Sequence, residues 1–450
     1  MPLKFYIICL TVLSWLTAAA APILDIDGEE STSIGIYIKD LTTGRVVVSH
    51  NASLALTPAS VLKAVTTATA LEKLGADFRF TTRVALAGKP GADRRSWEGD
   101  LVIFGSADPT LESDQFKACN GLTDSITAAL RRRGITRITG SVVIVESLRD
   151  AGPIAQWEVE DIAWPYGAGL YGFNYAGNYV RVYPNKGTTS PASSLKIKVL
   201  PAAEADGNDL LRGAGADNLT VWATPRSRRD PNWSLNATVP DPAGVYAALL
   251  LDRLNAAGIR TGSRPANADR SDATTIYVHR SAPGAEIMAN LMKRSDNLFA
   301  EGMLRAIDPG ASRKDCIEAE KDFWAARGLN SRHTIIKDGS GLTRGNKLPP
   351  RFLGDVLEQM ARGTNGATYA SFFPRAGMEG TLKSFLKKTR LKGRLALKTG
   401  SVAAVQCYAG YRLDWEGKPT HVVVIMVNGF FCPRAQLRSS IEKFLLKTFE

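Results

Sequence analysis

The stretch Thr57-Pro-Ala-Ser-Val-Leu-Lys63 opens a segment that the sequence predicts to be a buried helix, running to about Gly75. Thr57 is of a residue type that caps helices, and Pro58 suits the first helical position because its missing N–H has no partner to lose there. Most of the following side chains are apolar or threonine, which is typical of a helix that crosses the interior. Ser60 and Lys63 are the polar exceptions in its first two turns, and their spacing places them on one face.

This pair is a candidate nucleophile and base. A serine hydroxyl is rarely ionised at neutral pH, so it needs a nearby group to accept its proton before it attacks. A lysine amine can accept that proton only when it is neutral, and both burial and a second nearby cation favour the neutral form. A chance occurrence stays open at this point, because the same Ser-x-x-Lys pattern recurs at Ser193–Lys196, Ser384–Lys387 and Ser440–Lys443.

Composition and charge exclude several other classes of protein. The net charge of +12 comes from scattered Lys and Arg residues whose longest run is Arg131–Arg133, so no nucleic-acid partner is expected. The chain has four histidines and no His-Glu-x-x-His, which argues against a zinc hydrolase and against a Ser-His-Asp triad. We therefore expect neither a metal nor a cofactor.

The N-terminus has the pattern of a secretory signal. Lys4 precedes the apolar run 5–16 and the small residues Ala18–Ala21, which predicts a signal peptide over residues 1–20. The run is shorter than the ~20 apolar residues that span a bilayer, so an exported protein of the periplasm or cell envelope is expected, with at most peripheral membrane contact. A retained N-terminal anchor is the alternative. Cys407 and Cys432 flank a predicted hairpin, which leaves a disulfide between them open.

The order of the predicted elements indicates an α/β (α+β) fold. A predicted hairpin, 33–39 and 45–49, leads into the Ser60 helix, and residues 83–272 are rich in short β-like runs. After them the pattern predicts helices, then two strands and a final helix, at 285–305, 315–327, 350–362, 405–414, 420–427 and 438–449. We therefore predict a catalytic domain built from residues 21–82 and 273–450, split by a β-rich insertion at 83–272 that forms two small subdomains.

Two further motifs follow in the catalytic part. Ser295-Asp-Asn297 stands in a predicted helical region, and Lys398-Thr-Gly-Ser401 begins a predicted strand. Ser-x-x-Lys at a helix start, then Ser-Asp-Asn, then Lys-Thr-Gly is the three-part active site of β-lactamases and penicillin-binding proteins. Each motif alone is weak, and their order and context make the set specific.

With these motifs the sequence resembles the class C low-molecular-mass penicillin-binding proteins, the penicillin-binding protein 4 group of exported D-alanyl-D-alanine carboxypeptidases and endopeptidases. A long separation between Ser60 and Ser295 is typical of this group. Three further segments are similar to family signatures: Gly99-Asp-Leu with Asp108-Pro-Thr-Leu111, Asp338-Gly-Ser-Gly-Leu-Thr-Arg344-Gly-Asn346, and Ala376-Gly-Met-Glu-Gly-Thr-Leu382. The resemblance extends over nearly the whole chain after the signal, and it implies the penicillin-recognising serine transpeptidase/β-lactamase-like fold.

The resemblance also implies roles for single residues. Ser60 would attack the substrate carbonyl, Lys63 would take its proton, Ser295 would relay a proton to the leaving group and Asn297 would hold Lys63 and the peptide. Lys398 would help to keep Lys63 neutral and, with Thr399, face the substrate carboxylate. The amides of Ser60 and Ser401 would form the oxyanion hole. Asp161, in Trp157-Glu-Val-Glu-Asp161, and Arg344 would contact the substrate, although a turn and a structural ion pair are alternative roles for them.

The implied function is that of an exported serine D-Ala-D-Ala carboxypeptidase that acts on peptidoglycan stem peptides through a Ser60 acyl-enzyme. β-Lactams would be covalent inhibitors, and cleavage of peptide cross-links is a further implied activity. A β-lactamase and a non-catalytic peptidoglycan-binding protein are the alternatives that the sequence leaves.

Overall fold

The computed structural model describes residues 22–202, 207–266 and 270–450, so the predicted signal peptide lies outside the described residues. By their internal contacts these residues form two units, 22–32 with 430–450 and 33–429. The first unit contains the helix α11 (Arg434–Thr448), whose buried side chains Leu437, Ile441 and Leu445 recur every four residues and so share one face.

The second unit contains a five-stranded antiparallel sheet in the order β15-β16-β17-β1-β2. The two strands nearest the N-terminus, β1 and β2, form the predicted hairpin. The strands are β1 (Ser33–Asp40), β2 (Val46–His50), β15 (Leu395–Val402), β16 (Val405–Leu413) and β17 (Pro419–Asn428). Residues far apart in the sequence thus share one sheet, because β1 pairs with β17.

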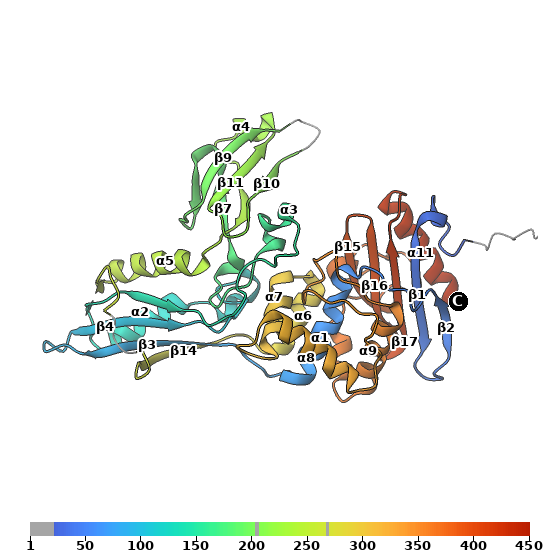
Figure 1. The fold of residues 1–450 in the computed structure, drawn as a ribbon, viewed down its shortest axis with the longest axis horizontal. Coiled ribbons are helices and arrows are strands. Elements are labelled where there is room, and N and C mark those ends of the chain that lie inside the picture. The colour runs from blue at the N-terminus through green and yellow to red at the C-terminus, as the bar shows by residue number, and fades with distance from the viewer. Residues whose placement is uncertain (1–21, 203–206, 267–269) are drawn as a thin grey trace, which may run out of the picture. The chain divides into compact units, whose positions relative to one another are not determined.

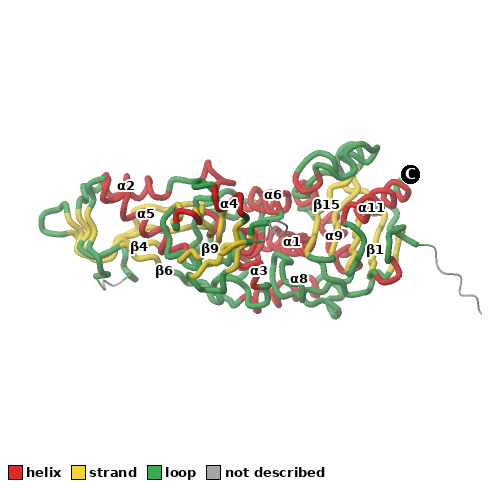
Figure 2. The backbone as a smooth tube through the Cα atoms, turned by 90° about the horizontal axis from the view of Figure 1, so that it is seen from above, coloured by secondary structure: helices red, strands yellow, loops and turns green. Residues whose placement is uncertain are grey.

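Helices that share one hydrophobic core with this sheet pack beside it (Figure 1). They are α1 (Lys63–Leu74), α6 (Gly284–Arg294), α7 (Asn297–Ala306), α8 (Arg313–Ala325), α9 (Pro350–Arg362) and α10 (Gly366–Ser371). α9 shows why the sequence forms such a helix: Pro350 stands in its first turn, and Phe352, Leu353, Val356, Leu357 and Met360 are all buried on one side. Burial of each such side chain contributes about 1.5–3 kcal/mol. The views of Figures 1 and 2 both place α1 beside β15.

Between α1 and α6 the residues that the structure describes form three more sheets. The largest has the order β13-β5-β4-β3-β14 with β6 on β4, and it shares a core with the helices α2 and α5. Two three-stranded sheets, β10-β11-β9 and β12-β7-β8, share a second core. The elements are β3 (Thr81–Pro90), β4 (Ser96–Phe104), α2 (Leu122–Arg132), β5 (Arg137–Ile138), β6 (Val142–Val145), α3 (Val159–Ile162), β7 (Tyr179–Tyr183), β8 (Thr188–Ser190), β9 (Lys196–Pro201), β10 (Asp209–Leu211), β11 (Asn218–Ala223), α4 (Pro225–Arg229), β12 (Leu235–Thr238), α5 (Pro242–Ala256), β13 (Arg260–Thr261) and β14 (Thr274–Arg280).

The strands that enter and leave this region, β3 and β14, are paired with each other. The boundaries that we predicted for the insertion, 83 and 272, fall near the starts of these two strands. The division into a catalytic domain and an insertion of two subdomains stays a prediction.

Two sequence expectations about helices are wrong in detail. Thr57 does not cap the Ser60 helix, because its hydroxyl donates to the Arg344 carbonyl at 3.3 Å and accepts from Lys347 Nζ at 2.8 Å. The predicted helix 285–305 is two helices, because Ser295 adopts a left-handed conformation with φ 63° and Asp296 caps α7 by accepting from Phe299 N.

The disulfide left open by the sequence is not formed. Cys407 and Cys432 are both free thiols. Cys407 instead lies buried in β16, with its Sγ 3.5 Å from the Thr57 carbonyl oxygen. Among the described helices, none is both long and apolar enough to cross a membrane.

Candidate active site

The Ser60 segment places a half-buried hydroxyl three residues before a buried lysine. Residues Ala59–Leu62 form a 3-10 turn and Lys63 begins α1. Ala59 has a positive φ of 46°, an uncommon conformation for a residue with a Cβ, so the neighbouring structure holds the turn that presents Ser60. Lys63 is fully buried, and its Nζ lies 2.9 Å from Ser60 Oγ.

Three acceptors surround the Lys63 amine. Besides Ser60 Oγ, it donates to Asn297 Oδ1 at 2.6 Å and to the Ser340 carbonyl at 2.6 Å. Burial lowers the pKa of Lys63 to about 8, while three nearby carboxylates oppose the decrease, those of Asp338, Asp296 and Glu301. A substantial fraction of this amine is therefore neutral near pH 8 and able to accept a proton from Ser60.

The other copies of the Ser-x-x-Lys pattern lack this environment. Lys196, Lys387 and Lys443 are all exposed to solvent, so nothing desolvates their amines. Burial of the amine separates the pair at Ser60 and Lys63 from the chance matches.

The second motif reaches the site because the chain breaks between α6 and α7. Ser295 ends α6 in its left-handed conformation, and Asn297 begins α7 with its side chain nearly buried. Asn297 Oδ1 accepts from Lys63, and its Nδ2 donates to the Tyr166 carbonyl at 2.7 Å. Both polar atoms of the amide are therefore in use, which fixes its orientation.

The third motif lies on β15, next to Ser60. Lys398 is fully buried, and its Nζ donates to Ser295 Oγ at 2.8 Å and to the Thr399 carbonyl at 2.7 Å. Burial, and then the positive charge of Lys63, hold the pKa of Lys398 well below its ordinary value. The hydroxyl of Thr399 forms a hydrogen bond with the hydroxyl of Thr381 at 2.8 Å. Ser401 is exposed to solvent.

Gly400 allows β15 to approach the nucleophile closely. A Cβ at this position would lie 2.6 Å from the Pro58 carbonyl oxygen and 3.0 Å from the Ser60 amide nitrogen, which is closer than side chains tolerate. The backbone of the strand therefore runs against the Ser60 turn, as a site that uses backbone amides from both segments requires.

The predicted substrate residues Asp161 and Arg344 are less buried than Lys63 and Lys398. Asp161 is in α3, half-buried, and accepts from the Tyr166 hydroxyl at 3.0 Å. Burial raises the pKa of Asp161, and the Tyr166 bond and the charge of Arg344 oppose the increase. Arg344 is exposed, and its Nε lies 3.6 Å from a carboxylate oxygen of Glu158. The segment that carries Asp161 is tied to the site by Tyr166, whose carbonyl holds Asn297.

Sequence reasoning assigned no role to several groups that complete this site. The roles of the Ser340 and Tyr166 carbonyls could not be predicted from residue type, because every residue has a backbone carbonyl. The signature Asp338-Gly-Ser-Gly341 did mark the Ser340 loop, and Glu301, four residues after Asn297, is the buried acid behind it.

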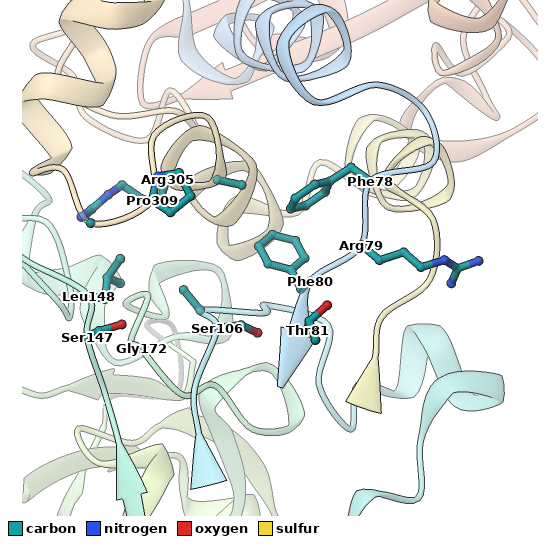
Figure 3. A pocket seen from close by; sticks show the side chains of 13 residues that line it. Phe78, Arg79, Phe80, Thr81, Ser106, Ser147, Leu148, Gly172, Arg305 and Pro309 are labelled. Atoms are coloured by element: carbon teal, nitrogen blue, oxygen red, sulfur yellow. The ribbon is translucent and has the colours of Figure 1, made fainter. Parts of the chain in front are cut away.

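An apolar pocket lies elsewhere in the same unit (Figure 3). Its cavity of about 260 Å³ is lined by residues such as Phe78, Phe80, Leu148 and Pro309, and none of the residues of the three motifs lines it. Figure 3 shows the two phenylalanine rings facing it from the chain segment that enters β3. Within the described ranges, no group of three or more His, Cys, Asp and Glu residues is arranged to hold a metal ion.

Comparison with known proteins decides the family. The sequence profile of the D-Ala-D-Ala carboxypeptidase 3 (S13) family matches residues 17–444. The chain belongs to this family. The resemblance to the penicillin-binding protein 4 group that the sequence motifs indicated is thereby confirmed.

Two curated relatives match most of this chain. A D-alanyl-D-alanine carboxypeptidase of Actinomadura sp. (strain R39) is 27% identical over 435 residues, which are 89% of this chain and 79% of the relative. The D-alanyl-D-alanine carboxypeptidase DacB of Haemophilus influenzae is 25% identical over 450 residues, 94% of this chain and 90% of the relative.

Similar solved structures confirm the predicted fold. Penicillin-binding protein 4 (DacB) of Haemophilus influenzae has a TM-score of 0.78 to this chain at 23% identity, covering 94% of this chain and 97% of that one. A predatory endopeptidase of Bdellovibrio bacteriovorus, Bd0816, has a TM-score of 0.53 at 17% identity, covering 92% and 93%. The penicillin-recognising fold, which the family resemblance implied, is therefore confirmed.

Proposed function

We propose that this S13 protein is a serine D-Ala-D-Ala carboxypeptidase that forms an acyl-enzyme on Ser60. The observation that carries the proposal is the buried Lys63 amine, 2.9 Å from Ser60 Oγ, with a pKa near 8. A neutral amine at this distance is a general base within hydrogen-bond reach of the proton that it must remove. The relatives in Actinomadura sp. and Haemophilus influenzae, both named D-alanyl-D-alanine carboxypeptidases, support the same conclusion.

The proposed reaction has two halves. Neutral Lys63 accepts the Ser60 proton while Oγ attacks the carbonyl carbon of the penultimate D-alanine. The C–N bond then breaks and the electron pair stays with the leaving D-alanine, whose nitrogen takes the proton of the Ser295 hydroxyl, held by Lys398. The Ser295 hydroxyl regains a proton from Lys63, so the proton removed from Ser60 ends on the leaving amine and both Lys63 and Ser295 are restored. Water then attacks the ester, which releases the shortened peptide and restores Ser60.

Binding of the substrate follows from the same geometry. The terminal carboxylate would lie against Lys398 and Thr399, and the oxyanion would receive hydrogen bonds from the amides of Ser60 and Ser401. Loss of one such donor costs about 2.7–4 kcal/mol in known serine enzymes. β-Lactams are proposed to acylate Ser60 as well, in keeping with the crystal structure of penicillin-binding protein 4 of Haemophilus influenzae in complex with a β-lactam.

We further propose that the protein is exported and acts on peptidoglycan stem peptides, with a signal-like sequence at its N-terminus. The region predicted as an insertion, 83–272, would bind the part of the stem peptide that lies beyond the reacting bond. Asp161 is the proposed contact for a free amine of a diamino acid, and Arg344 for a carboxylate.

Release of D-alanine tests the activity. The purified protein should liberate D-alanine from a pentapeptide that ends in D-Ala-D-Ala. A non-catalytic peptidoglycan-binding protein would bind this peptide without releasing D-alanine. A β-lactamase would turn over nitrocefin rapidly and would keep no acyl group, whereas the proposed enzyme should retain a persistent acyl-enzyme with penicillin. Incubation with cross-linked dimeric peptides measures the rate at which the protein cleaves cross-links, for comparison with its rate of D-alanine release.

Acylation by penicillin is expected to rise with pH through a midpoint near 8. Burial lowers the pKa of Lys63 to about 8, and only the neutral amine accepts the Ser60 proton. Below the midpoint the rate should therefore fall about tenfold per pH unit, and above it the rate should level off. Second-order rate constants across this range give the midpoint. A midpoint near the ~10.4 of a free lysine would contradict the role of burial.

Asp161→Asn is expected to slow the cleavage of amine-bearing peptides while penicillin acylation stays nearly unchanged. A charge-assisted bond between Asp161 and the substrate ammonium contributes ~1.5–3 kcal/mol, or roughly ten- to a hundredfold in kcat/KM, and penicillin lacks that amine. Glu160→Gln, which removes the neighbouring exposed acid, is the matched control. An equal fall in both rates would show that Asp161 is structural, and an unchanged peptide rate would remove it from the site.

A further inference from the structure

A buried carboxylate stands directly behind the loop that holds Lys63. Glu301 lies on α7, four residues after Asn297, and is 1% exposed. Its Oε1 accepts from the amides of Gly339 at 2.9 Å and Ser340 at 2.8 Å. The carbonyl of the same Ser340 accepts from Lys63 Nζ at 2.6 Å. One peptide segment thus connects the carboxylate to the proposed base.

The rest of this loop is fixed from other sides. Asp338 accepts from the amides of Gly341 and Thr343 and from the indole N–H of Trp157. The Gly339 carbonyl accepts from Thr66 on α1 at 2.9 Å. Glu301 is therefore the side chain that holds the Gly339 and Ser340 amides, and without it these two buried donors would lose the acceptor that the structure gives them.

We propose that Glu301 is a positioning residue, which holds the Ser340 carbonyl against the Lys63 amine so that this amine stays directed at Ser60. The proposal rests on the proposed function, because it assigns a partner to the same base. It adds a residue outside the three motifs, since the acid neither touches Ser60 nor faces the substrate carboxylate site. Its consequence is that the geometry of the base depends on a side chain behind the reacting groups.

The charge of Glu301 has a second effect on Lys63. The groups that face Glu301 are Asp338 on the loop, Arg313 and Glu320 on α8, and Lys63 on α1. Burial and then Asp338 raise the pKa of Glu301 to about 7, so the acid is mostly ionised at the pH where Lys63 titrates. Ionised Glu301 favours the Lys63 ammonium, as do Asp338 and Asp296. Removal of its charge should therefore lower the pKa of Lys63.

Two substitutions separate position from charge. Glu301→Gln retains an acceptor for the two amides and removes the charge, whereas Glu301→Ala removes both. In the full chain, Gln should keep the high-pH acylation rate within a few-fold and shift the midpoint to lower pH by roughly half a unit to one unit. Ala should lower the high-pH rate by roughly ten- to a hundredfold, the loss that a missing hydrogen bond at a buried group produces.

Glu320 provides the matched control. It is a second fully buried acid, on α8, and its pKa is raised by burial to about 8, but it holds no amide of the 338–341 loop. Glu320→Gln and Glu320→Ala should leave the midpoint and the high-pH rate close to those of the unmodified chain. Penicillin acylation of the unmodified chain is measured first, and its absence would refute the proposed function rather than the role of Glu301.

The result that supports positioning is a large fall for Glu301→Ala with recovery by Gln. Equal high-pH rates for Glu301→Ala and Glu320→Ala would overturn it, and so would a Gln variant that is as slow as Ala. If Glu301→Ala does not fold, Glu301→Met, which fills more of the buried volume but offers no acceptor to the two amides, takes its place. A high-pH rate at least about tenfold below that of Glu301→Gln supports the proposal, and equal rates of the two variants overturn it.

Discussion

Ser60→Ala is expected to abolish both D-alanine release and covalent penicillin attachment. The variant loses the only atom that can form the acyl bond in the proposed reaction, while Lys63 keeps two of its three partners, Asn297 and Ser340. The side chain of Ser60 is small and half-buried, so its removal should change the thermal midpoint little. Fluorescent penicillin labelling, D-alanine release and a thermal melt of the same preparation measure the three quantities.

The chain offers a matched control for this substitution. Ser384 opens another Ser-x-x-Lys match, and its Lys387 is exposed. The Ser384→Ala variant should therefore be labelled by fluorescent penicillin to the same extent as the unmodified protein. Persistent labelling of the Ser60→Ala variant would remove Ser60 from the role of nucleophile.

Lys63→Met is expected to lower the acylation rate by about a hundred- to ten-thousandfold, the usual contribution of a general base. Methionine fills most of the buried volume but cannot accept a proton, so the rise of the rate near pH 8 should disappear as well. The measurement is the second-order rate constant for penicillin at several pH values, with folding checked by circular dichroism.

Lys73→Met is the control for charge and helix propensity, because Lys73 lies exposed near the end of the same helix. Penicillin should acylate this variant at the same rate as the unmodified protein. A Lys63→Met variant that retained the pH dependence of the unmodified protein would show that another group accepts the proton.

Local patterns predicted those parts of the fold that depend on neighbouring residues. Pro350–Arg362 is helical over the range that its apolar spacing indicated, and the β1–β2 hairpin begins within one residue of the expected position. The sequence proposed Ser60, Lys63, Ser295, Asn297 and Lys398 as site residues because short motifs record side-chain chemistry, and their roles stay a prediction. In the structure, hydrogen bonds connect them in two groups, Lys63 with Ser60 and Asn297, and Lys398 with Ser295.

The parts that sequence reasoning missed depend on contacts between distant segments. The break between α6 and α7 occurs at a serine in a left-handed conformation, which its residue type does not announce. Thr57 has the chemistry of a cap, yet the loop at Arg344 and Lys347 uses its hydroxyl. Ser340 contributes a carbonyl, which every residue has, and Glu301 acts on the site through that loop.

The location of the penicillin adduct tests the central claim most directly. The protein is treated with excess penicillin, the intact mass is measured, and the modified peptide is identified after digestion. We expect one adduct per chain, on the peptide that contains Ser60 and on Ser60 itself. An adduct on Ser193, Ser384 or Ser440, or the absence of any covalent adduct in a folded preparation, would contradict the proposal that this S13 protein works through a Ser60 acyl-enzyme.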